Sequence, residues 1–450
     1  MEPDAMQMTP SVPAAPVAEG MSTRSTRERM PVLQVLAVLL AQLTISVALI
    51  TPTTYSLAIW LQDTASASRD ALLAAAIGGS SVASLLVGPL IGALSDRTTV
   101  RLGPRRTWLV SGLVAGSIGS IIMIGIPSPV ALVLGWCIAA IGYGAANSMV
   151  MVYLSDRLPQ RQRGKVLGVS TAVIYLGPVV GVLLAGAVAT TPPLMFAIPS
   201  IAALLGGGVL ILVMHDPPVE PSTTPLRVVE MLEGYWVHPR RSPRFAWVWW
   251  NRAIFFLGVA FMTLYSVYFL STNIALDSAQ IAATMSLGGV IGVAVSTLGG
   301  VTCGTLSDRS SSRLPFIVAS TVLLALGLVV IATASSVPQY LVGNGINSFA
   351  IGVYSAVGQA LQFDVIPGER RNGRYLAVLG LSNQLPQAIG PFVAAGVLAV
   401  FGRDYAAMYF TAAGLVLLSL ITIVPLRHHL RIPSPTSEPA TSVAHTKENA

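Results

Sequence analysis

The chain has 450 residues, of which 53% are hydrophobic and only 10% are charged, with a formal net charge of +7. A water-soluble domain carries about a quarter charged residues, because its surface must be hydrated. The composition therefore excludes an ordinary soluble protein and points to a chain that lies mostly in a lipid bilayer. Its two cysteines, Cys137 and Cys303, lie in apolar stretches and support neither a disulfide framework nor a metal site.

Both ends of the chain are polar. Residues 1–31 are Pro-rich and carry three arginines directly before the first apolar run. That run is too long for a signal-peptide core and has no small-residue cleavage site. We therefore expect a disordered cytoplasmic N-terminal tail over 1–31, followed by a retained first span. Residues 428–450 form a second polar tail, also expected to be cytoplasmic, without a pattern that could build a core.

The apolar stretches between the tails have the length of membrane-spanning helices, which require roughly 20 residues each. They predict twelve transmembrane helices, at 33–57, 71–94, 108–126, 130–152, 166–190, 194–214, 247–271, 279–304, 315–333, 338–362, 376–399 and 406–426. A closed barrel would instead show short alternating segments, so the prediction is an all-α integral membrane protein.

A hydrophilic linker over 215–246 divides these spans into two six-helix bundles, at 32–214 and 247–427. Within this cytoplasmic linker, Thr224 and Pro225 can begin a helix, and apolar residues follow at helical spacing up to Trp236. We expect a short helix there on the inner membrane surface.

Basic residues predict the orientation. An even number of spans places both tails on one face, which we assign to the cytoplasm. Of the 26 Lys and Arg residues, all except Arg69, Arg252 and Arg403 then fall on this side, as the positive-inside rule requires. The charge is spread over short loops, so it does not indicate a nucleic-acid partner. The sequence thus predicts a multi-pass protein of the inner (plasma) membrane with both termini cytoplasmic.

The two halves repeat three motifs in the same order. The loop GALSDRTTVRL at 92–102 matches GTLSDRSSSRL at 304–314. An Asp that is followed by Pro and Arg ends the fourth span and the tenth span, and a Gly-Pro pair lies in the fifth and the eleventh. These pairs are Asp156 with Asp364, and Gly177-Pro178 with Gly390-Pro391. Such parallel repeats are typical of transporters whose substrate site lies near the bilayer midplane between the halves.

Over roughly 32–427 these motifs resemble those of the major facilitator superfamily (MFS). The loop from Gly92 is similar to the family's signature, Gly-x-x-x-Asp-Arg followed by a Gly and a basic pair, here Gly103 to Arg106. It departs from that signature by additional residues between Arg97 and Gly103. This longer form is more similar to the sucrose-type and glycoside–cation symporter branches than to the drug antiporters. The resemblance implies two pseudo-symmetric six-helix bundles that move a solute by rocker-switch alternating access.

The resemblance also implies that charged loop residues hold the cytoplasmic side shut in the outward-open state. Asp96 and Asp308 end inner-facing spans, where a carboxylate can cap a neighbouring helix and pair with nearby arginines. The alternative, that these charges only set topology, is weaker for Asp96 and about equal for Asp308. The expected cytoplasmic gate comprises Gly92, Asp96, Arg97, Arg101, Arg105, Arg106, Asp156, Arg163, Gly304, Asp308, Arg309, Arg313, Asp364 and Arg371.

Polar residues within the spans are the candidate substrate-binding groups, because polar side chains in lipid are costly unless they face protein or water. Amides and hydroxyls suit a neutral polyol such as a sugar, whereas the alternative role is hydrogen bonding between helices. Arg252 either snorkels to the interface or holds an anionic group or a coupling carboxylate. The candidates are Gln42, Thr44, Tyr55, Tyr143, Asn147, Asn251, Arg252, Tyr265, Tyr268, Asn344, Asn347, Tyr354, Asn383, Gln384 and Gln387.

The function that these features favour is secondary transport of a small polar solute, a sugar or related metabolite, with a proton or sodium ion as coupling cation. No His or carboxylate lies well inside a span, and Asp63, Asp70 and Asp364 are the nearest coupling candidates. A drug or metabolite exporter working as a proton antiporter, or an uncoupled facilitator, remains the alternative. The spans hold no catalytic constellation, so the sequence predicts no enzyme, no cofactor and no metal site. We expect a monomer.

Overall fold

The computed structural model describes residues 30–217, 242–310, 312–365 and 372–425. The two tails and the linker helix expected after Thr224 lie outside the described residues. Within these ranges every regular element is a helix.

The N-terminal half contains six helical spans. The first span is interrupted at Pro52, where a π-helical turn follows the α-helix. Proline lacks an N–H group and its ring clashes with the preceding turn, so the helix is irregular there. The elements are α1 (Val32–Thr51), η1 (Pro52–Ser56), α2 (Leu57–Thr64), α3 (Arg69–Ser95), α4 (Pro104–Gly125), α5 (Pro129–Arg157), α6 (Gln160–Ala187) and α7 (Pro192–Val213).

The C-terminal half contains six further spans, and its first and last are likewise built from two consecutive elements. They are α9 (Pro243–Leu264), α10 (Ser266–Asn273), α11 (Ser278–Arg309), α12 (Leu314–Ala332), α13 (Val337–Val365), α14 (Asn372–Val400), α15 (Tyr405–Leu418) and the 3-10 helix η3 (Ser419–Thr422). Each coincides with a span expected from the sequence. The largest differences are that the first span extends to Thr64 and that α6 begins at Gln160, and α9 begins at Pro243, inside the expected linker.

Ten helices of the described chain are long and apolar enough to cross a membrane. The two remaining spans, α13 and α14, carry several amide side chains in their middle, which lowers their hydropathy. They pack within the bundle beside apolar helices, α13 against α11 and α12 and α14 against α9. The fold is therefore an all-α membrane protein with two six-helix halves, which confirms the expected fold class.

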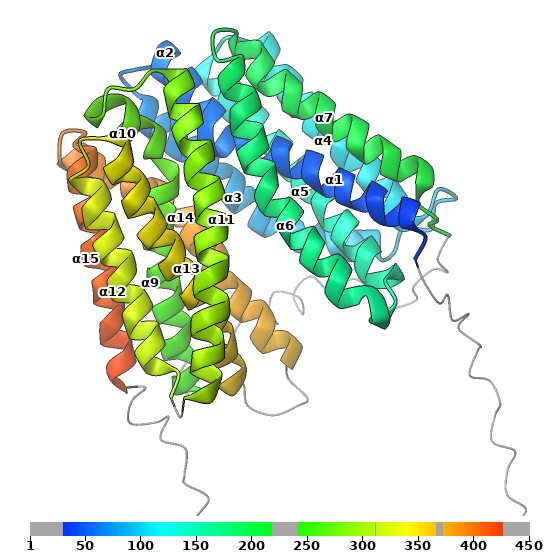
Figure 1. Cartoon of the computed structure of the whole chain (residues 1–450). Helices are drawn as coiled ribbons and strands as arrows, with labels where there is room; N and C mark the ends of the chain where they lie inside the picture. The colour runs from blue at the N-terminus through cyan, green and yellow to red at the C-terminus, as the bar shows by residue number, and fades with distance from the viewer. Residues whose placement is uncertain (1–29, 218–241, 311, 366–371, 426–450) are drawn as a thin grey trace, which may run out of the picture.

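The two halves lie side by side and contact each other mainly through two helix pairs (Figure 1). The pairs are α3 with α14 and α6 with α11, so the second span of each half meets the fifth span of the other. This exchange is what a two-fold relation between the halves produces. Figure 1 shows the halves meeting at one face and diverging at the other. We call the diverging face, where α1 begins and η3 ends, the tail face, and the other the opposite face.

The Gly-Pro motif of the repeat serves close packing inside each half. A Cβ on Gly177 of α6 would lie 2.8 Å from the Ser46 Cβ on α1. A Cβ on Gly390 of α14 would lie 2.9 Å from the Ala260 Cβ on α9. Glycine lets helix backbones approach closely where any side chain would hold them apart. The fifth span of each half thus packs against the first span of the same half.

Candidate functional site

A central cavity of about 590 Å³ lies between the halves. The elements α1, η1, α3 and α5 line it from the N-terminal half, and α9 and α14 line it from the C-terminal half. Its lining consists of Leu49, Ile50, Thr53, Ser80, Ser81, Ser84, Leu85, Trp136, Ala140, Arg252, Gly380, Asn383, Gln384 and Gln387. Most of these residues lie near the middle of their helices, so the cavity lies near the centre of the bundle.

Four of the expected binding residues line this cavity: Arg252, Asn383, Gln384 and Gln387. Sequence reasoning missed the serines of α3, Ser80, Ser81 and Ser84, which share the cavity with the amides of α14. The sequence could have indicated these serines, because Ser80 and Ser84 are four residues apart and therefore share one helical face. The expected binding residues come from the first and fourth spans of each half and from the eleventh span of the chain, and none comes from the second span.

Arg252 lies near the middle of α9 and lines the central cavity. It follows the start of α9 at Pro243 by nine residues, about 14 Å along the helix axis. Its guanidinium carbon lies 4.9 Å from the centre of the Phe256 ring. The Nε and Nη1 atoms are buried and have no hydrogen-bond partner in the described structure. Of the two roles expected for Arg252, its position in the lining of the central cavity favours the binding role.

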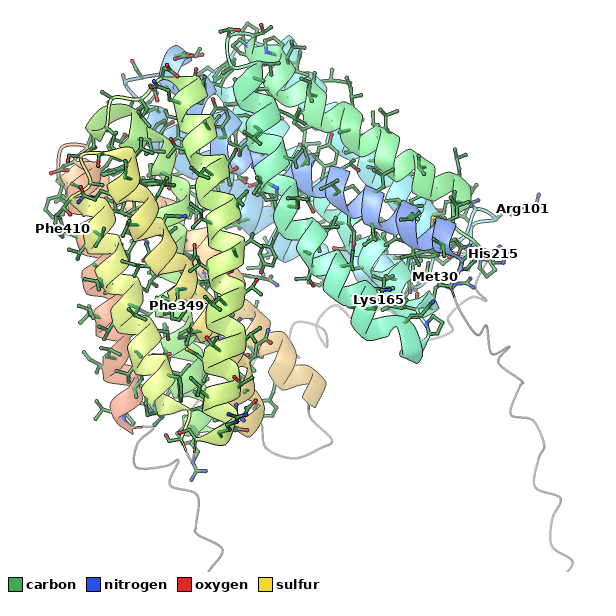
Figure 2. All side chains as sticks on the ribbon, in the orientation of Figure 1. Met30, Arg101, Lys165, His215, Phe349 and Phe410 are labelled. Carbon is green, nitrogen blue, oxygen red and sulfur yellow. The ribbon has the colours of Figure 1, made fainter. Side chains whose placement is uncertain are left out.

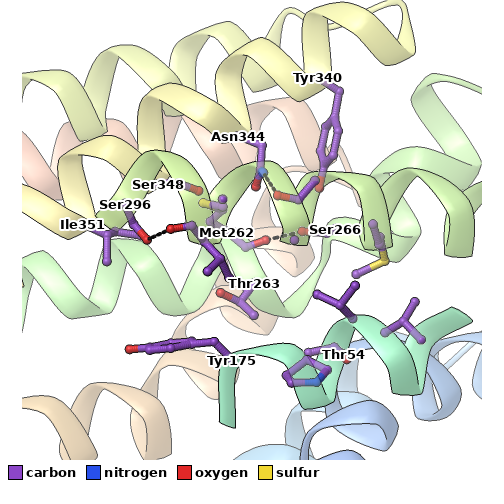
Figure 3. A pocket seen from close by; sticks show the side chains of 18 residues that line it. Thr54, Tyr175, Met262, Thr263, Ser266, Ser296, Tyr340, Asn344, Ser348 and Ile351 are labelled. Atoms are coloured by element: carbon purple, nitrogen blue, oxygen red, sulfur yellow. Dashed lines mark hydrogen bonds between the residues drawn. The ribbon is translucent and has the colours of Figure 1, made fainter. Parts of the chain in front are cut away.

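A second cavity of about 300 Å³ lies between α6 and the C-terminal half (Figure 3). Thr54 and Tyr175 face it from the N-terminal half, and Met262, Thr263 and Asn344 face it from the other half. The Asn344 amide donates a hydrogen bond to the Gly288 carbonyl at 3.0 Å. The Asn344 amide thus already has a hydrogen-bond partner on the neighbouring helix, whereas two Arg252 nitrogen atoms have none.

Most of the other expected binding residues form their hydrogen bonds or contacts within a single half. The Gln42 amide contacts the Met151 sulfur at 3.0 Å and accepts a 2.6 Å bond from Ser170. Tyr143 donates to Ser200 at 2.7 Å. These side chains are buried, and their bonds join helices of the same bundle, which is the role expected of polar groups as interhelical contacts.

The same holds in the C-terminal half. Asn251 donates to the Ser419 carbonyl at 3.0 Å and accepts from Tyr354 at 2.7 Å, and Tyr354 stacks on Phe255. Asn347 contacts the Met262 sulfur at 3.3 Å. The remaining two lie in the N-terminal half: Thr44 bonds to its own helix, and Asn147 is half-buried with no partner at its Oδ1 atom.

Three expected binding tyrosines lie instead where the halves meet at the opposite face. Tyr55 donates to the Ser278 carbonyl at 2.6 Å, and Tyr265 donates to the Asp70 carbonyl at 3.2 Å. The ring of Tyr268 lies 4.6 Å from the Arg69 guanidinium carbon. Each of these contacts joins one half to the other.

Asp70 lies at the centre of this group, which we call the opposite-face cluster: Arg69, Asp70, Tyr265, Tyr268, Arg403 and Tyr405. One Asp70 oxygen accepts a 2.8 Å bond from the Tyr405 hydroxyl, and the other lies 3.3 Å from the Arg403 Nε atom. Arg69 donates to the Tyr405 hydroxyl at 3.0 Å. Asp70 is 6% exposed and is the only buried carboxylate among the described residues. The cluster thus joins the two halves through one ion pair and several hydrogen bonds.

At the tail face the ion pairs lie within single halves. Arg105 bridges Asp96 at 2.7 Å and Asp156 at 3.3 Å, all in the N-terminal half. Arg313 bridges Asp308 at 3.3 Å and Asp364 at 2.8 Å in the C-terminal half. We call these the N-terminal and C-terminal triads. No described residue forms an ion pair between the halves at this face.

The N-terminal triad corrects the pairing expected from the repeat. Aligned by sequence, Arg101 is the counterpart of Arg313, but Arg101 is exposed and Arg105 takes that role. Arg101 lies three residues before the start of α4, whereas Arg313 directly precedes α12, and Arg105 in the first turn of α4 contacts Asp96 instead. Arg97 and Arg309 have no ion-pair partner among the described residues, the side chain of Arg163 is not described, and Arg371 lies outside the described chain.

The carboxylate that caps a helix here is Asp216, at the end of α7. Its Oδ2 atom accepts a 2.8 Å bond from the Arg106 backbone N–H in the first turn of α4. The Arg106 side chain donates to the Met214 carbonyl at 2.5 Å. The expected capping by Asp96 is therefore replaced by Asp216, whereas Asp96 pairs with a side chain. A Cβ on Gly92 would meet nothing within 4 Å, and one on Gly304 would meet only Ala356, at 3.6 Å.

The helices, the two-fold relation and the cavity between the halves together define a multi-pass membrane transporter. The sequence profile of the Major Facilitator Superfamily matches residues 35–303 and 294–448. The chain therefore belongs to this superfamily and is a transporter, not an enzyme. No curated protein matches the sequence closely enough to count as a relative.

Solved structures share the fold at low sequence identity. The nucleoside transporter NupG is 13% identical with a TM-score of 0.69, over 88% of this chain and 100% of that one. A bacterial homologue of the human lysosomal transporter Spinster, inward-facing and occupied, is 15% identical with a TM-score of 0.66, over 88% and 95%. A D-xylose–proton symporter is 17% identical with a TM-score of 0.62, over 87% and 96%. At these identities the likeness concerns the fold alone.

Proposed function

We propose that this protein carries a small polar solute across the inner (plasma) membrane by rocker-switch alternating access, and that the structure corresponds to its inward-facing state. The observation that carries the proposal is the distribution of bonds between the halves. Every described hydrogen bond and ion pair that joins the halves lies at the opposite face or toward it. The triads at the tail face each stay within one half.

The tail face is assigned to the cytoplasm because of its basic residues. Arg101 and Lys165 lie at this end of the N-terminal half, together with His215 (Figure 2). Basic loops are retained on the cytoplasmic side during membrane insertion. The central cavity, which lies between halves that diverge toward this face, then exchanges its solute with the cytoplasm.

A sugar or related polar metabolite is the solute class that the central cavity favours. Eight of its lining residues have polar side chains, and Trp136 is its one aromatic residue among the described positions. Its volume is in the range of small-molecule sites. A drug exporter of the alternative class would need an apolar, aromatic cavity. The additional residues after Arg97 support the sucrose-type and glycoside–cation symporter branches in the same direction.

Asp70 is the proposed proton-coupling group. It faces Arg403 and Tyr405 from the segment around the start of α15, Tyr265 and Tyr268 from α9 and α10, and its neighbour Arg69. Protonation removes the carboxylate charge and with it the ion pair to Arg403. A proton from the opposite face would thereby weaken the closure and favour opening toward that face, as a symporter requires.

A thermal-shift ligand screen on the purified protein tests the solute class. Monosaccharides, disaccharides and glycosides are compared with lipophilic cations, since a ligand that binds the folded state raises the melting temperature. We expect a polar solute to stabilise the protein and this shift to be lost in Gln384→Ala, which removes a cavity amide. Gln339→Ala is the control, because that amide bonds to Thr333 in a loop at the opposite face.

Stabilisation by lipophilic cations alone would favour the exporter instead. A sugar-induced shift that survives Gln384→Ala would place the binding site outside the central cavity.

A further inference from the structure

We infer that the solute carries one anionic group, most simply a carboxylate, and that Arg252 binds it in the central cavity. This inference rests on the proposed function and names the substrate class of the same site. It replaces a neutral sugar by an acidic polar metabolite.

The charge of Arg252 is unpaired. A guanidinium has five N–H donors, and two of the three nitrogen atoms here are buried without a hydrogen-bond partner. The guanidinium lies over the Phe256 ring, which attracts a cation more weakly than a carboxylate does. The side chain is half-buried in the lining of the cavity, and donors removed from water without a partner are unfavourable, so an anion in the cavity would stabilise this guanidinium.

No described carboxylate is free to be that counter-ion. Asp70 pairs with Arg403, and the carboxylates of the two triads pair with Arg105 and Arg313. Three others, Asp216, Asp277 and Asp404, accept hydrogen bonds at helix N-termini. The last, Asp63, is exposed near the end of α2 at the opposite face. The partner of Arg252 is therefore expected to enter with the solute.

The lining around Arg252 also favours an anion. The described lining of the central cavity contains no acidic residue, and its polar groups are hydroxyls and amides that can donate hydrogen bonds. The Trp136 Nε1 atom, in a second lining residue, is also buried without a hydrogen-bond partner. Two residues that line this cavity, one from each half, thus carry buried donors without a partner, and a change of side-chain rotamer would turn these donors toward an acceptor-rich ligand.

The charge of the ligand follows from the number of cations. Arg252 is the only basic residue in the described lining of the central cavity. One guanidinium neutralises one negative charge, and its planar donors match the two oxygens of a carboxylate. A phosphate monoester carries between one and two charges near neutral pH and would keep an excess charge in the cavity. The serines and amides remain available for the hydroxyls of the same solute.

The test uses matched solutes on the full-length protein. D-Gluconate, D-glucose 6-phosphate and D-glucose have the same carbon number but differ in charge, and pyruvate, lactate and their amides extend the panel. Melting temperature is recorded against concentration for the unmodified protein, Arg252→Gln and Arg244→Gln. We expect carboxylates to stabilise the protein. Arg252→Gln should weaken their binding affinity about 10- to 100-fold, because a hydrogen bond to a charged group is lost. Arg244→Gln, at an exposed arginine in the first turn of the same helix, should leave binding unchanged.

Two results overturn the inference. If neutral solutes bind as tightly as the acids, and if their binding is unchanged in Arg252→Gln, the anion inference fails while the proposed transport of a polar solute stands. If binding prefers the phosphate ester and depends on Arg252, the anionic group stands but the carboxylate assignment is wrong.

A second readout needs no ligand. If Arg252 is kept for a solute, it destabilises the empty protein, so Arg252→Met should raise the melting temperature measured without solute. If Arg252 has a structural role instead, the same substitution should lower the melting temperature, and that result overturns the inference even when no solute in the panel binds.

Discussion

Arg403 and Asp70 form the single ion pair that joins the two halves in the described part of the chain, with 3.3 Å between the Arg403 Nε atom and an Asp70 oxygen. Arg403 also donates to the backbone carbonyls of Ser66 and Ala67, which precede α3. A half-exposed cation thus holds the loop before α3 and the first turn of that helix at once. Because the pair closes the opposite face, its strength helps set the balance between the two transport states.

Replacing Asp70 by Asn tests this closure. Asn keeps the size of the side chain but removes the charge, so the closed opposite face loses its ion pair and the equilibrium shifts toward the state open on that face.

Distances between spin labels measure the shift. Labels on Thr191 and Ser335, exposed positions at the opposite face, are introduced after Cys137 and Cys303 are replaced by serine. We expect a longer distance in Asp70→Asn. The exposed carboxylate Asp63 is the control, and an equal change in Asp63→Asn would mean that net charge, not the ion pair, controls the equilibrium.

Replacing Arg105 by Gln tests the N-terminal triad. Arg105 contacts two carboxylates and the Ser95 hydroxyl, so its loss should lower the free energy of unfolding. The two partners are 66% and 49% exposed, which limits the effect to about 1 kcal/mol. Arg101→Gln, in the same loop but exposed and without an ion-pair partner in the described chain, should have almost no effect. Thermal unfolding of both variants measures this difference. Equal losses of stability in the two variants would show that only the total charge of this loop matters.

Replacing Gly142 by Val tests the contact between α4 and α5. A Cβ at Gly142 would overlap the Gly116 backbone nitrogen and lie 2.7 Å from the Gly112 carbonyl oxygen. Backbone atoms cannot rotate away as a side chain can, so the two helices must separate. We expect a loss above about 3 kcal/mol, the upper range for overpacking. Gly144→Val should be tolerated, since nothing lies within 4 Å there. The yield of monodisperse protein in size-exclusion chromatography measures both; an equal yield would contradict the prediction.

Replacing Gly186 by Leu acts between the halves instead. A Cβ at Gly186 of α6 would overlap the Ala282 Cβ on α11, near the opposite face. Each half can remain folded while the two are pushed apart, so stability should change little and the distance between labels at Thr191 and Ser335 should increase. Gly168→Leu on the same helix is the control, because a side chain there meets nothing within 4 Å. An unchanged label distance in Gly186→Leu would show that the closure adapts.

Much of the fold could be predicted because its causes are local. The length of each apolar stretch predicts a span, and the motifs at Gly92 and Gly304 reveal the duplication without any knowledge of contacts. The sequence also indicated that polar residues within the spans matter. It could not tell Gln42 from Gln384, since both are amides within apolar helices.

The tertiary structure decided which face each helix turns toward its neighbours. Gln42 contacts Met151 and Ser170 inside the N-terminal half, whereas Gln384 lines the central cavity. Likewise, Asp70 meets Tyr405 across 335 residues of chain. The physical reason is that helix rotation and long-range pairing depend on packing between helices, where small residues and side-chain shapes select one arrangement. A single span encodes its own length and hydropathy, but its functional face exists only once its neighbours are in place.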